Sequence, residues 1–143
     1  MAVQTIGTKT NIPFQSGSAI AVQGVIAQDA ARSTTLAQFT LMGKIAASGK
    51  WTPLTDLAAV TGVVDTLGIY VGDDIAAATL VAGDVENCKI IKAGFPLFVD
   101  PAQLVLENSL TLDDVASVAG VLTVEDILNR QGIFTHTHEN IFA

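Results

Sequence analysis

Short alternations of apolar and polar residues dominate the chain from residue 36 onward. In LAQFTLMGKI the apolar residues Leu36, Phe39 and Leu41 predict one strand, and SGKWTPL predicts a turn followed by a second strand. Three later stretches, LGIYV, ATLVAGD and CKIIKAG, each predict a strand bounded by Gly or Asp. Strands separated by turn residues about every eight to twelve positions are typical of a small barrel or sandwich.

Helical signals come late in the chain. LTLDDVASVAG predicts one short helix, with acidic residues in its first turn and a glycine as its stop. LTVEDILNRQG gives the clearest signal, because Thr123 is a good N-cap and Asp126 stands three residues later, in the capping-box position. GIFTHTH then returns to strand-like alternation. We therefore predict a mainly β fold with one or two short helices in a small barrel-like domain.

Residues 1–33 differ in amino-acid composition from the rest of the chain. Their only charged residues are Lys9, Asp29 and Arg32, and single apolar residues alternate with Ser, Thr, Gln, Asn and Gly. A segment of this kind buries too little apolar surface to fold by itself. We expect an extended N-terminal arm over residues 1–33, ending in a strand at AIAVQGVIAQ, and a β-rich domain over residues 34–143.

Charge and hydropathy narrow the classes of function. Fourteen acidic and seven basic residues give a formal net charge of −7, and the basic residues are scattered. This balance disfavours binding to nucleic acid or to anionic lipid. The mean hydropathy of +0.50 is high for a monomer of this size and predicts interfaces buried between subunits.

No pattern indicates export or a disulfide. The N-terminal residues lack the features of a signal peptide, and the longest uncharged run is too polar to span a bilayer. The single cysteine, Cys88, has no partner for an internal disulfide, so we expect a buried and reduced thiol.

One cluster near the C-terminus has the residue types of a metal site: His136, His138 and Glu139. On a strand the two histidines would share one face and Glu139 would lie on the other, whereas a catalytic zinc ion needs three protein ligands. The histidine box of cupins places its glutamate several residues further along, so that resemblance fails. We expect no metal site here, and a small metal-dependent cupin-like enzyme remains the alternative from another class.

Two acidic pairs are the other candidates for chemistry. Asp73 and Asp74 follow a glycine in a predicted turn, and Asp113 and Asp114 fall in the first turn of a predicted helix, where negative charge is favourable. No nucleophile elbow and no phosphate-binding glycine loop is present in the sequence. We therefore expect no catalytic residue, no cofactor and no enzymatic activity.

Three stretches follow one another along the chain: LMGKIAASGKWTPLTD, AAVTGVVDTLGIYVGDDI and TLVAGDVENCKIIKAGFPLFVDPAQL. In this order they resemble the head decoration (capsid cement) proteins of lambda-like tailed bacteriophages. The later segment VEDILNRQGIFT is similar to the short helix and Gly-Ile strand that close the family's domain. The resemblance covers roughly residues 34–135, and the insert at residues 106–123 and the tail THTHENIFA depart from the family pattern.

The resemblance implies a β-tulip-like domain that assembles as a homotrimer on the outer surface of an expanded icosahedral capsid. There it would bind the major capsid protein at three-fold and quasi-three-fold positions and stabilise the shell against internal DNA pressure. A late virion protein of this family is made in the host cytoplasm and contacts neither nucleic acid nor a membrane. Another head-associated or tail subunit of the virion is the alternative within the structural class.

The resemblance also implies an arm that is loose in solution and ordered on the capsid. We place the capsid-binding part at Thr8, Thr10, Ile12, Pro13 and Phe14, where apolar and polar residues alternate and Phe14 is the expected anchor. An extended segment of this kind binds by adding a strand to an exposed sheet edge. Three arms on one trimer would bind more tightly than one, because the first contact raises the effective concentration of the others.

Overall fold

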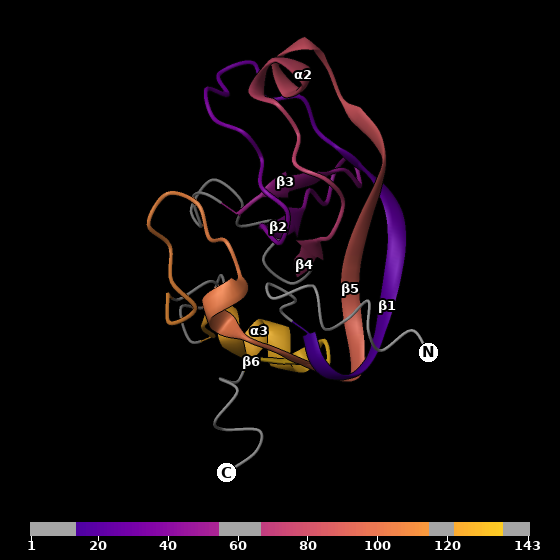
Figure 1. The fold of residues 1–143 in the computed structure, drawn as a ribbon, viewed down its shortest axis with the longest axis vertical. Helices are drawn as coiled ribbons and strands as arrows, with labels where there is room; N and C mark the ends of the chain where they lie inside the picture. Colours follow the sequence, from indigo (N-terminus) through magenta and orange to yellow (C-terminus); the bar gives the residue numbers. More distant parts are fainter. Residues whose placement is uncertain (1–13, 55–66, 115–121, 136–143) are drawn as a thin grey trace, which may run out of the picture.

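A computed structural model describes residues 14–54, 67–114 and 122–135 of the chain (Figure 1). Within these segments the chain is mainly β. In chain order the elements are β1 (Phe14–Ile26), β2 (Leu41–Lys44), β3 (Trp51–Pro53), β4 (Leu67–Tyr70), α2 (Ala77–Ala82), β5 (Val85–Val99), the 3-10 helix η2 (Pro101–Gln103), α3 (Val124–Arg130) and β6 (Ile133–Thr135).

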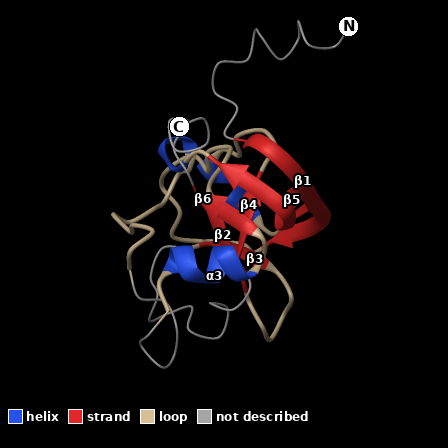
Figure 2. Cartoon of the chain, turned by 90° about the horizontal axis from the view of Figure 1, so that it is seen from below, coloured by secondary structure: helices blue, strands red, loops and turns tan. Residues whose placement is uncertain are grey.

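Five of these strands form a closed barrel. Their order is β1-β3-β2-β4-β5, and β1 pairs back with β5 to close the ring. The sixth strand, β6, lies outside the ring and pairs in parallel with residues 97–99 of β5. Figure 2 shows this arrangement from below, with β1 and β5 side by side. The prediction of a mainly β, barrel-like domain with short helices is confirmed.

The ribbon of β1 and β5 is the longest pairing in the barrel. The two strands have 13 and 15 residues and run antiparallel from Phe14 opposite Val99 to Ile26 opposite Val85. Register shifts interrupt the ladder at four places, and at three of them β5 contains the additional residue. Because each bulge bends its strand and increases the local twist, the ribbon curves along the side of the barrel (Figure 1).

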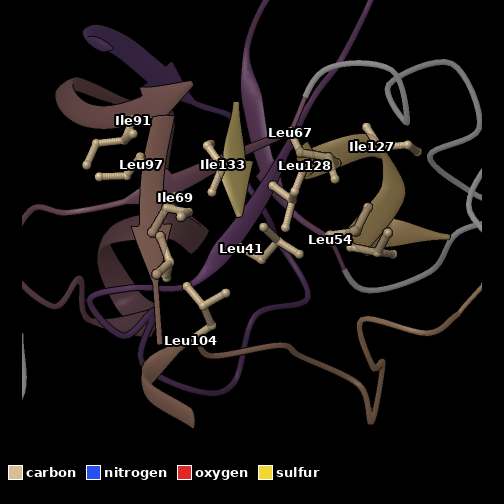
Figure 3. Close-up of a cluster of buried hydrophobic side chains, with 12 residues drawn as sticks. Leu41, Leu54, Leu67, Ile69, Ile91, Leu97, Leu104, Ile127, Leu128 and Ile133 are labelled. Carbon is tan, nitrogen blue, oxygen red and sulfur yellow. The ribbon is translucent and has the colours of Figure 1, made fainter. Parts of the chain in front are cut away.

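The buried side chains form two clusters. The first, shown in Figure 3, joins the barrel to α3 and β6 and is almost entirely Leu, Ile and Val. The second surrounds Trp51 and Tyr70 and is closed by Leu80 of α2. Burial of aliphatic side chains of this size contributes about 1.5–3 kcal/mol each, so these clusters supply most of the driving force for folding.

Trp51 packs between two strands that carry glycine where they face it. A Cβ atom on Gly24 of β1 would lie 2.7 Å from Trp51 Cδ1. A Cβ atom on Gly68 of β4 would lie 2.9 Å from Trp51 Cζ3 and 2.6 Å from Ile90 Cγ2. Real side chains do not approach so closely, so the position of the indole requires glycine on both strands.

A glycine contact and one glutamine attach the end of α3 to the barrel. Gly132, with φ +81, lies against Gly94 so closely that neither residue has room for a Cβ atom. The Gln131 side chain accepts from the Leu67 amide at 2.8 Å, and its Nε2 donates to the carbonyls of Leu67 and Lys92, each at 2.7 Å. Gln131 thereby satisfies backbone groups of both β4 and β5.

The predicted helix at the end of the chain is confirmed together with its cap. Asp126 N donates to Thr123 Oγ1 at 3.1 Å, and Thr123 N donates to Asp126 Oδ2 at 3.0 Å, which completes the capping box. Val124, Ile127 and Leu128 are buried against the barrel. The return to a strand is also confirmed for Ile133–Thr135.

One strand prediction is wrong. The stretch ATLVAGD was expected to form a strand, but Ala77–Ala82 is the helix α2, and only Leu80 is buried in it. Alanine has the highest intrinsic helix propensity, and three of the six residues of α2 are alanine. One buried leucine in a short helix gives no alternation that distinguishes it from a strand.

The N-terminal boundary also differs from the expectation. An arm was predicted over residues 1–33, with a strand only near its end, but residues 14–26 form the barrel strand β1 and residues 27–33 connect it to the domain. Residues 1–13 lie outside the part that the structure describes. The sequence of β1 looked like an arm because the strand that pairs with it, β5, lies far away along the chain.

The described part of the insert at residues 106–123 covers the first core cluster. Leu106, Leu110, Leu112 and Leu122 are partly buried against it. The helix expected in LTLDDVASVAG falls mostly on residues outside the described segments, and its first residues form a turn.

Gly68→Ala is expected to lower the free energy of unfolding by about 1–3 kcal/mol, because the new methyl group has no space between Trp51 and Ile90. Gly83→Ala is the matched control, since nothing lies within 4 Å of its added Cβ atom. Urea unfolding followed by the fluorescence of the single tryptophan measures both variants. Equal stability of the two variants would contradict the proposed packing of Trp51.

Candidate interaction surface

Over the part of the chain that the structure describes, the outer edge of β1 has no strand beside it along most of its length. One edge of the strand pairs with β5 from Phe14 to Ile26, and the other pairs with β3 only at Ile26 opposite Trp51. No other described strand pairs with β1. Because alternate residues of a strand direct their N–H and C=O groups to the same edge, about half of residues 14–25 present backbone groups that another strand could pair with.

Two of the usual protective features of an edge strand, charged side chains and proline, are absent from β1. The sequence of β1, FQSGSAIAVQGVI, contains no charged residue and no proline. Edge strands normally carry such residues because an open edge otherwise pairs with other chains. Among the β1 side chains whose exposure is described, Ala19, Ala21 and Gln23 are exposed, and two of these three are small.

A bulge in β5 exposes an aromatic ring beside β1. Gly17 pairs with Leu97 and Ala19 pairs with Gly94, so Phe95 and Pro96 together lie opposite one residue of β1. Phe95 is 69% exposed, the highest value among the exposed large hydrophobic residues of the described segments. Proline fits at this bulge because it has no N–H group to contribute to the ladder.

A second pair of aromatic rings lies where β5 meets β6. Phe98 and Phe134 are opposite each other in register, and their ring centroids are 5.8 Å apart. The neighbouring residues Leu97, Val99 and Ile133 are buried in the core, so alternation places the two rings on the outer face. Both rings are half-buried.

These rings are unusual in a protein with so few aromatic residues. None of the four phenylalanines whose side chains the structure describes is fully buried, whereas the core is built from aliphatic residues together with Trp51 and Tyr70. Phenylalanine is ordinarily among the residues most often buried. Phe95 is the exposed one among these four, and an exposed aromatic residue beside a strand edge that no described strand pairs with is typical of a surface that binds another protein.

The structure places one of the five predicted arm residues. Phe14 is the first residue of β1, and its backbone pairs with Val99. Thr8, Thr10, Ile12 and Pro13 precede the first described residue, so their role as a capsid-binding segment stays a prediction. The chain that contains them leads directly into the open strand.

The residues predicted as candidates for a metal site lie outside the part of the chain that the structure describes. His136, His138 and Glu139 lie beyond Thr135, the last residue that the structure describes. Over the described segments, no group of three His, Cys, Asp or Glu side chains is placed to hold a metal ion.

One member of each acidic pair fixes a loop. Asp74 Oδ1 accepts from the Gln38 amide at 2.8 Å, and Asp114 Oδ2 accepts from the Thr111 amide at 2.7 Å. Each carboxylate thus holds a backbone group of a connecting segment. This agrees with the predicted turn for Asp74, whereas Asp114 was expected in the first turn of a helix.

Arg32 and Glu107 line an open hollow of about 420 Å³ between residues 29–34 and residues 107–108. The guanidinium pairs with both carboxylate oxygens of Glu107, and it also donates to the carbonyls of Thr34 and Thr35. The hydrogen bond with Glu107 raises the pKa of Arg32. Because its donors are used within the chain, Arg32 attaches the insert to the barrel and leaves little for a ligand.

Two buried titratable groups lie close together in the second core cluster. Burial raises the pKa of the Cys88 thiol, so the thiolate that a nucleophile requires is disfavoured. Burial also raises the pKa of Tyr70 to about 12, with smaller contributions from Cys88, Asp73 and Asp74. The Tyr70 hydroxyl donates to the Asp73 carbonyl. Both groups are neutral near pH 7 and belong to the packing of the barrel.

Searches of protein families, curated proteins and solved structures found no match to this chain. None of the described helices is long and apolar enough to cross a bilayer.

The exposure of Phe95 was not predicted from the sequence. In CKIIKAGFPLFVD the strand-like pattern of apolar and polar residues continues through the glycine. The only sign of a bulge in this stretch is the Gly-Phe-Pro triplet. The open edge of β1 was not predicted either, because it depends on which strands become neighbours in space.

Phe95→Ser is expected to change the free energy of unfolding by less than about 0.5 kcal/mol, because the ring is largely exposed. Leu97→Ala, two residues away in the core, should lower it by about 2–5 kcal/mol. Urea denaturation of both variants tests the contrast. A loss for Phe95→Ser as large as that for Leu97→Ala would mean that the ring is packed within the subunit.

Absorbance of the single tyrosine, Tyr70, should titrate near pH 12 in the folded protein and near its ordinary pKa of 10 after unfolding. Since the unfolded state loses this proton first, the contribution of Tyr70 to stability is complete below pH 10 and is lost as the pH rises toward 12. Tyr70→Phe should flatten this part of the stability profile. Titration of the folded protein near pH 10 would contradict burial of the hydroxyl.

Proposed function

We propose that this chain is a structural subunit that decorates the outer surface of an expanded phage capsid, as a homotrimer bound to the major capsid protein. The observation that carries the proposal is the uncharged edge of β1, with which no described strand pairs over most of its length and which continues directly from the predicted capsid-binding arm. The sequence resemblance to lambda-like decoration proteins supplies the kind of partner. A structural role rather than a catalytic one follows from this reading.

Strand pairing is the interaction that such an edge favours. The backbone N–H and C=O groups of β1 supply hydrogen bonds along a line, and nearby apolar side chains supply contact area. Phe95 is an exposed aromatic side chain in position to make that contact near the start of β1. Aromatic anchors of this kind account for a large share of binding energy at protein interfaces.

An arm anchored to a barrel strand suits a protein that must resist force. Residues 1–13 join β1 without an intervening described element, so tension on a docked arm would act along the strand. That strand is held to β5 over most of its length. The load would then be shared by many backbone hydrogen bonds rather than carried by one flexible connection.

Deletion of residues 1–13 is expected to leave a folded trimer that no longer binds expanded shells of the cognate phage. The reason is that the deletion removes the arm but retains the whole of β1. Co-sedimentation with expanded and unexpanded shells measures binding, and mass measurement in solution checks the trimer. A variant with residues 1–13 in scrambled order is the control for length and composition.

Full binding by the deleted variant would contradict the arm mechanism. Electron microscopy of the purified chain tests the alternative structural role, because tubes or rings formed by this chain alone would favour a tail or head-associated subunit instead.

A further inference from the structure

The outer face of the β1–β5 ribbon, at one side of the barrel, carries a row of three exposed β5 residues: Lys89, Lys92 and Phe95 (Figure 1). Ile90 and Leu97 of the same strand are buried in the core. Register shifts explain why exposed residues recur at every third position, because Lys92 is the additional residue of one bulge and Phe95 belongs to the next. At about 3.3 Å per residue, the row is roughly 20 Å long.

The neighbouring residues of β1 leave this row uncovered. Ala19 and Ala21 are the exposed residues of β1 beside Phe95 and Lys92. Each has only a methyl group on the outer face, so the longer side chains of Lys92 and Phe95 project beyond them. The Phe95 ring is 69% exposed. The face is therefore a low surface from which a few long side chains project.

The two lysines of the row have no acidic partner within the described segments. Ion pairs balance the charges of Arg32 and Lys50, whereas Lys89 and Lys92 take part in none. Lysines without partners are notable here, because the chain has fourteen acidic and only seven basic residues. Two uncompensated positive charges thus lie on one face of a protein whose net charge is −7.

The end of α3 adds a third cation beside the row. Gln131 Nε2 donates to the Lys92 carbonyl at 2.7 Å, and the Gln131 carbonyl accepts from the Gly94 amide at 3.0 Å. Arg130 directly precedes Gln131, is exposed, and takes part in no ion pair with a described residue. Since consecutive Cα atoms are about 3.8 Å apart, Arg130 is held close to the middle of the row.

The acidic residues on adjoining elements lie toward the other end of the row. Glu86 precedes Lys89 on β5, and Asp73 follows β4, which pairs with β5. Neither carboxylate forms an ion pair with Lys89. The part of the face from Lys92 to Phe95 is therefore both its most positive and its most apolar part.

A face of this kind favours an acidic protein surface. Exposed cations attract carboxylates and orient the approaching partner, and an aromatic side chain contributes affinity when it enters a pocket. Nucleic acid fits less well, because three cations are few and the net charge of −7 repels phosphates. The face also adjoins the strand edge that the proposed function assigns to the capsid protein, so one partner can contact both.

We propose that Lys89, Lys92, Phe95 and Arg130 form a docking face for an acidic surface of the major capsid protein, with Phe95 inserted into an apolar pocket of that surface. The inference rests on the proposed function for the identity of the partner, and it adds the chemistry that the partner must present. Strand pairing uses backbone groups that every protein has, whereas side-chain contacts give specificity. This face thus distinguishes the correct shell from other exposed strands.

Charge reversal tests the electrostatic part. Lys92→Glu is expected to weaken binding to expanded shells of the cognate phage by about tenfold at about 0.1 M salt. Lys50→Glu is the matched control, because it makes the same change at a lysine whose charge Asp84 already balances, and it should alter binding by less than about twofold. Raising the salt to about 1 M shortens the Debye length from about 10 Å to about 3 Å, so the difference between Lys92→Glu and the parent chain should largely disappear.

Phe95→Ser tests the apolar part. This variant is expected to weaken binding by about tenfold at both salt concentrations, because salt does not screen the burial of an apolar ring. Phe95→Leu should retain most of the affinity, since leucine keeps much of the apolar surface. Co-sedimentation of each variant with shells that lack this chain measures binding, and circular dichroism checks that each variant is folded.

The outcomes separate this inference from the proposed function. Binding by Lys92→Glu as tight as that of the parent would overturn the acidic partner, and unchanged binding by Phe95→Ser would overturn the pocket; in either case the decoration role would stand. A parent chain that binds no expanded shell at either salt concentration would contradict both proposals. Binding of the parent to a short DNA duplex, measured by fluorescence anisotropy and abolished by Lys92→Glu, would overturn the inference in favour of a nucleic-acid site.

Discussion

Closure of the barrel depends on one pairing, that of β1 with β5. This ladder joins a strand near the start of the chain to one near its centre, and without it the other four strands would be an open sheet. It also brings Gly24 against Trp51, around which the second core cluster is built. The bulges that let the ribbon curve are the same irregularities that expose Phe95, so the shape of the barrel and the candidate surface have a common origin.

Local signals predicted the elements whose structure is decided locally. The strands at Trp51–Pro53 and Leu67–Tyr70 followed from alternation and turn residues, and α3 followed from its capping box, which needs only Thr123 and Asp126. The failures have a different cause. Ala77–Ala82 is too short for the periodicity of a helix to be recognised. The residues of β1 are largely polar or small, and they form a strand because β5 pairs with them.

The candidate surface was predictable only in part. The sequence marked the segment that ends at Phe14 as one that interacts by strand addition, and the open edge of β1 continues that segment within the described structure. The aromatic residues at the surface could not be found in this way, because Phe95, Phe98 and Phe134 occur in stretches that look like ordinary core strands. Which face of a strand is buried follows from the bulges and neighbours of β5, and these are properties of the assembled barrel.

The distance along the chain between the two strands of the closing ribbon affects how the protein is made. Val85 follows Ile26 by 59 residues, so at about 5–20 residues per second a ribosome needs roughly 3–12 s to reach the start of the second strand after the first has been synthesised. During that interval both edges of an uncharged segment are unpaired. Nonlocal pairings of this kind also form slowly, so nascent chains translated close together on one message would be exposed to premature strand exchange before any barrel has closed.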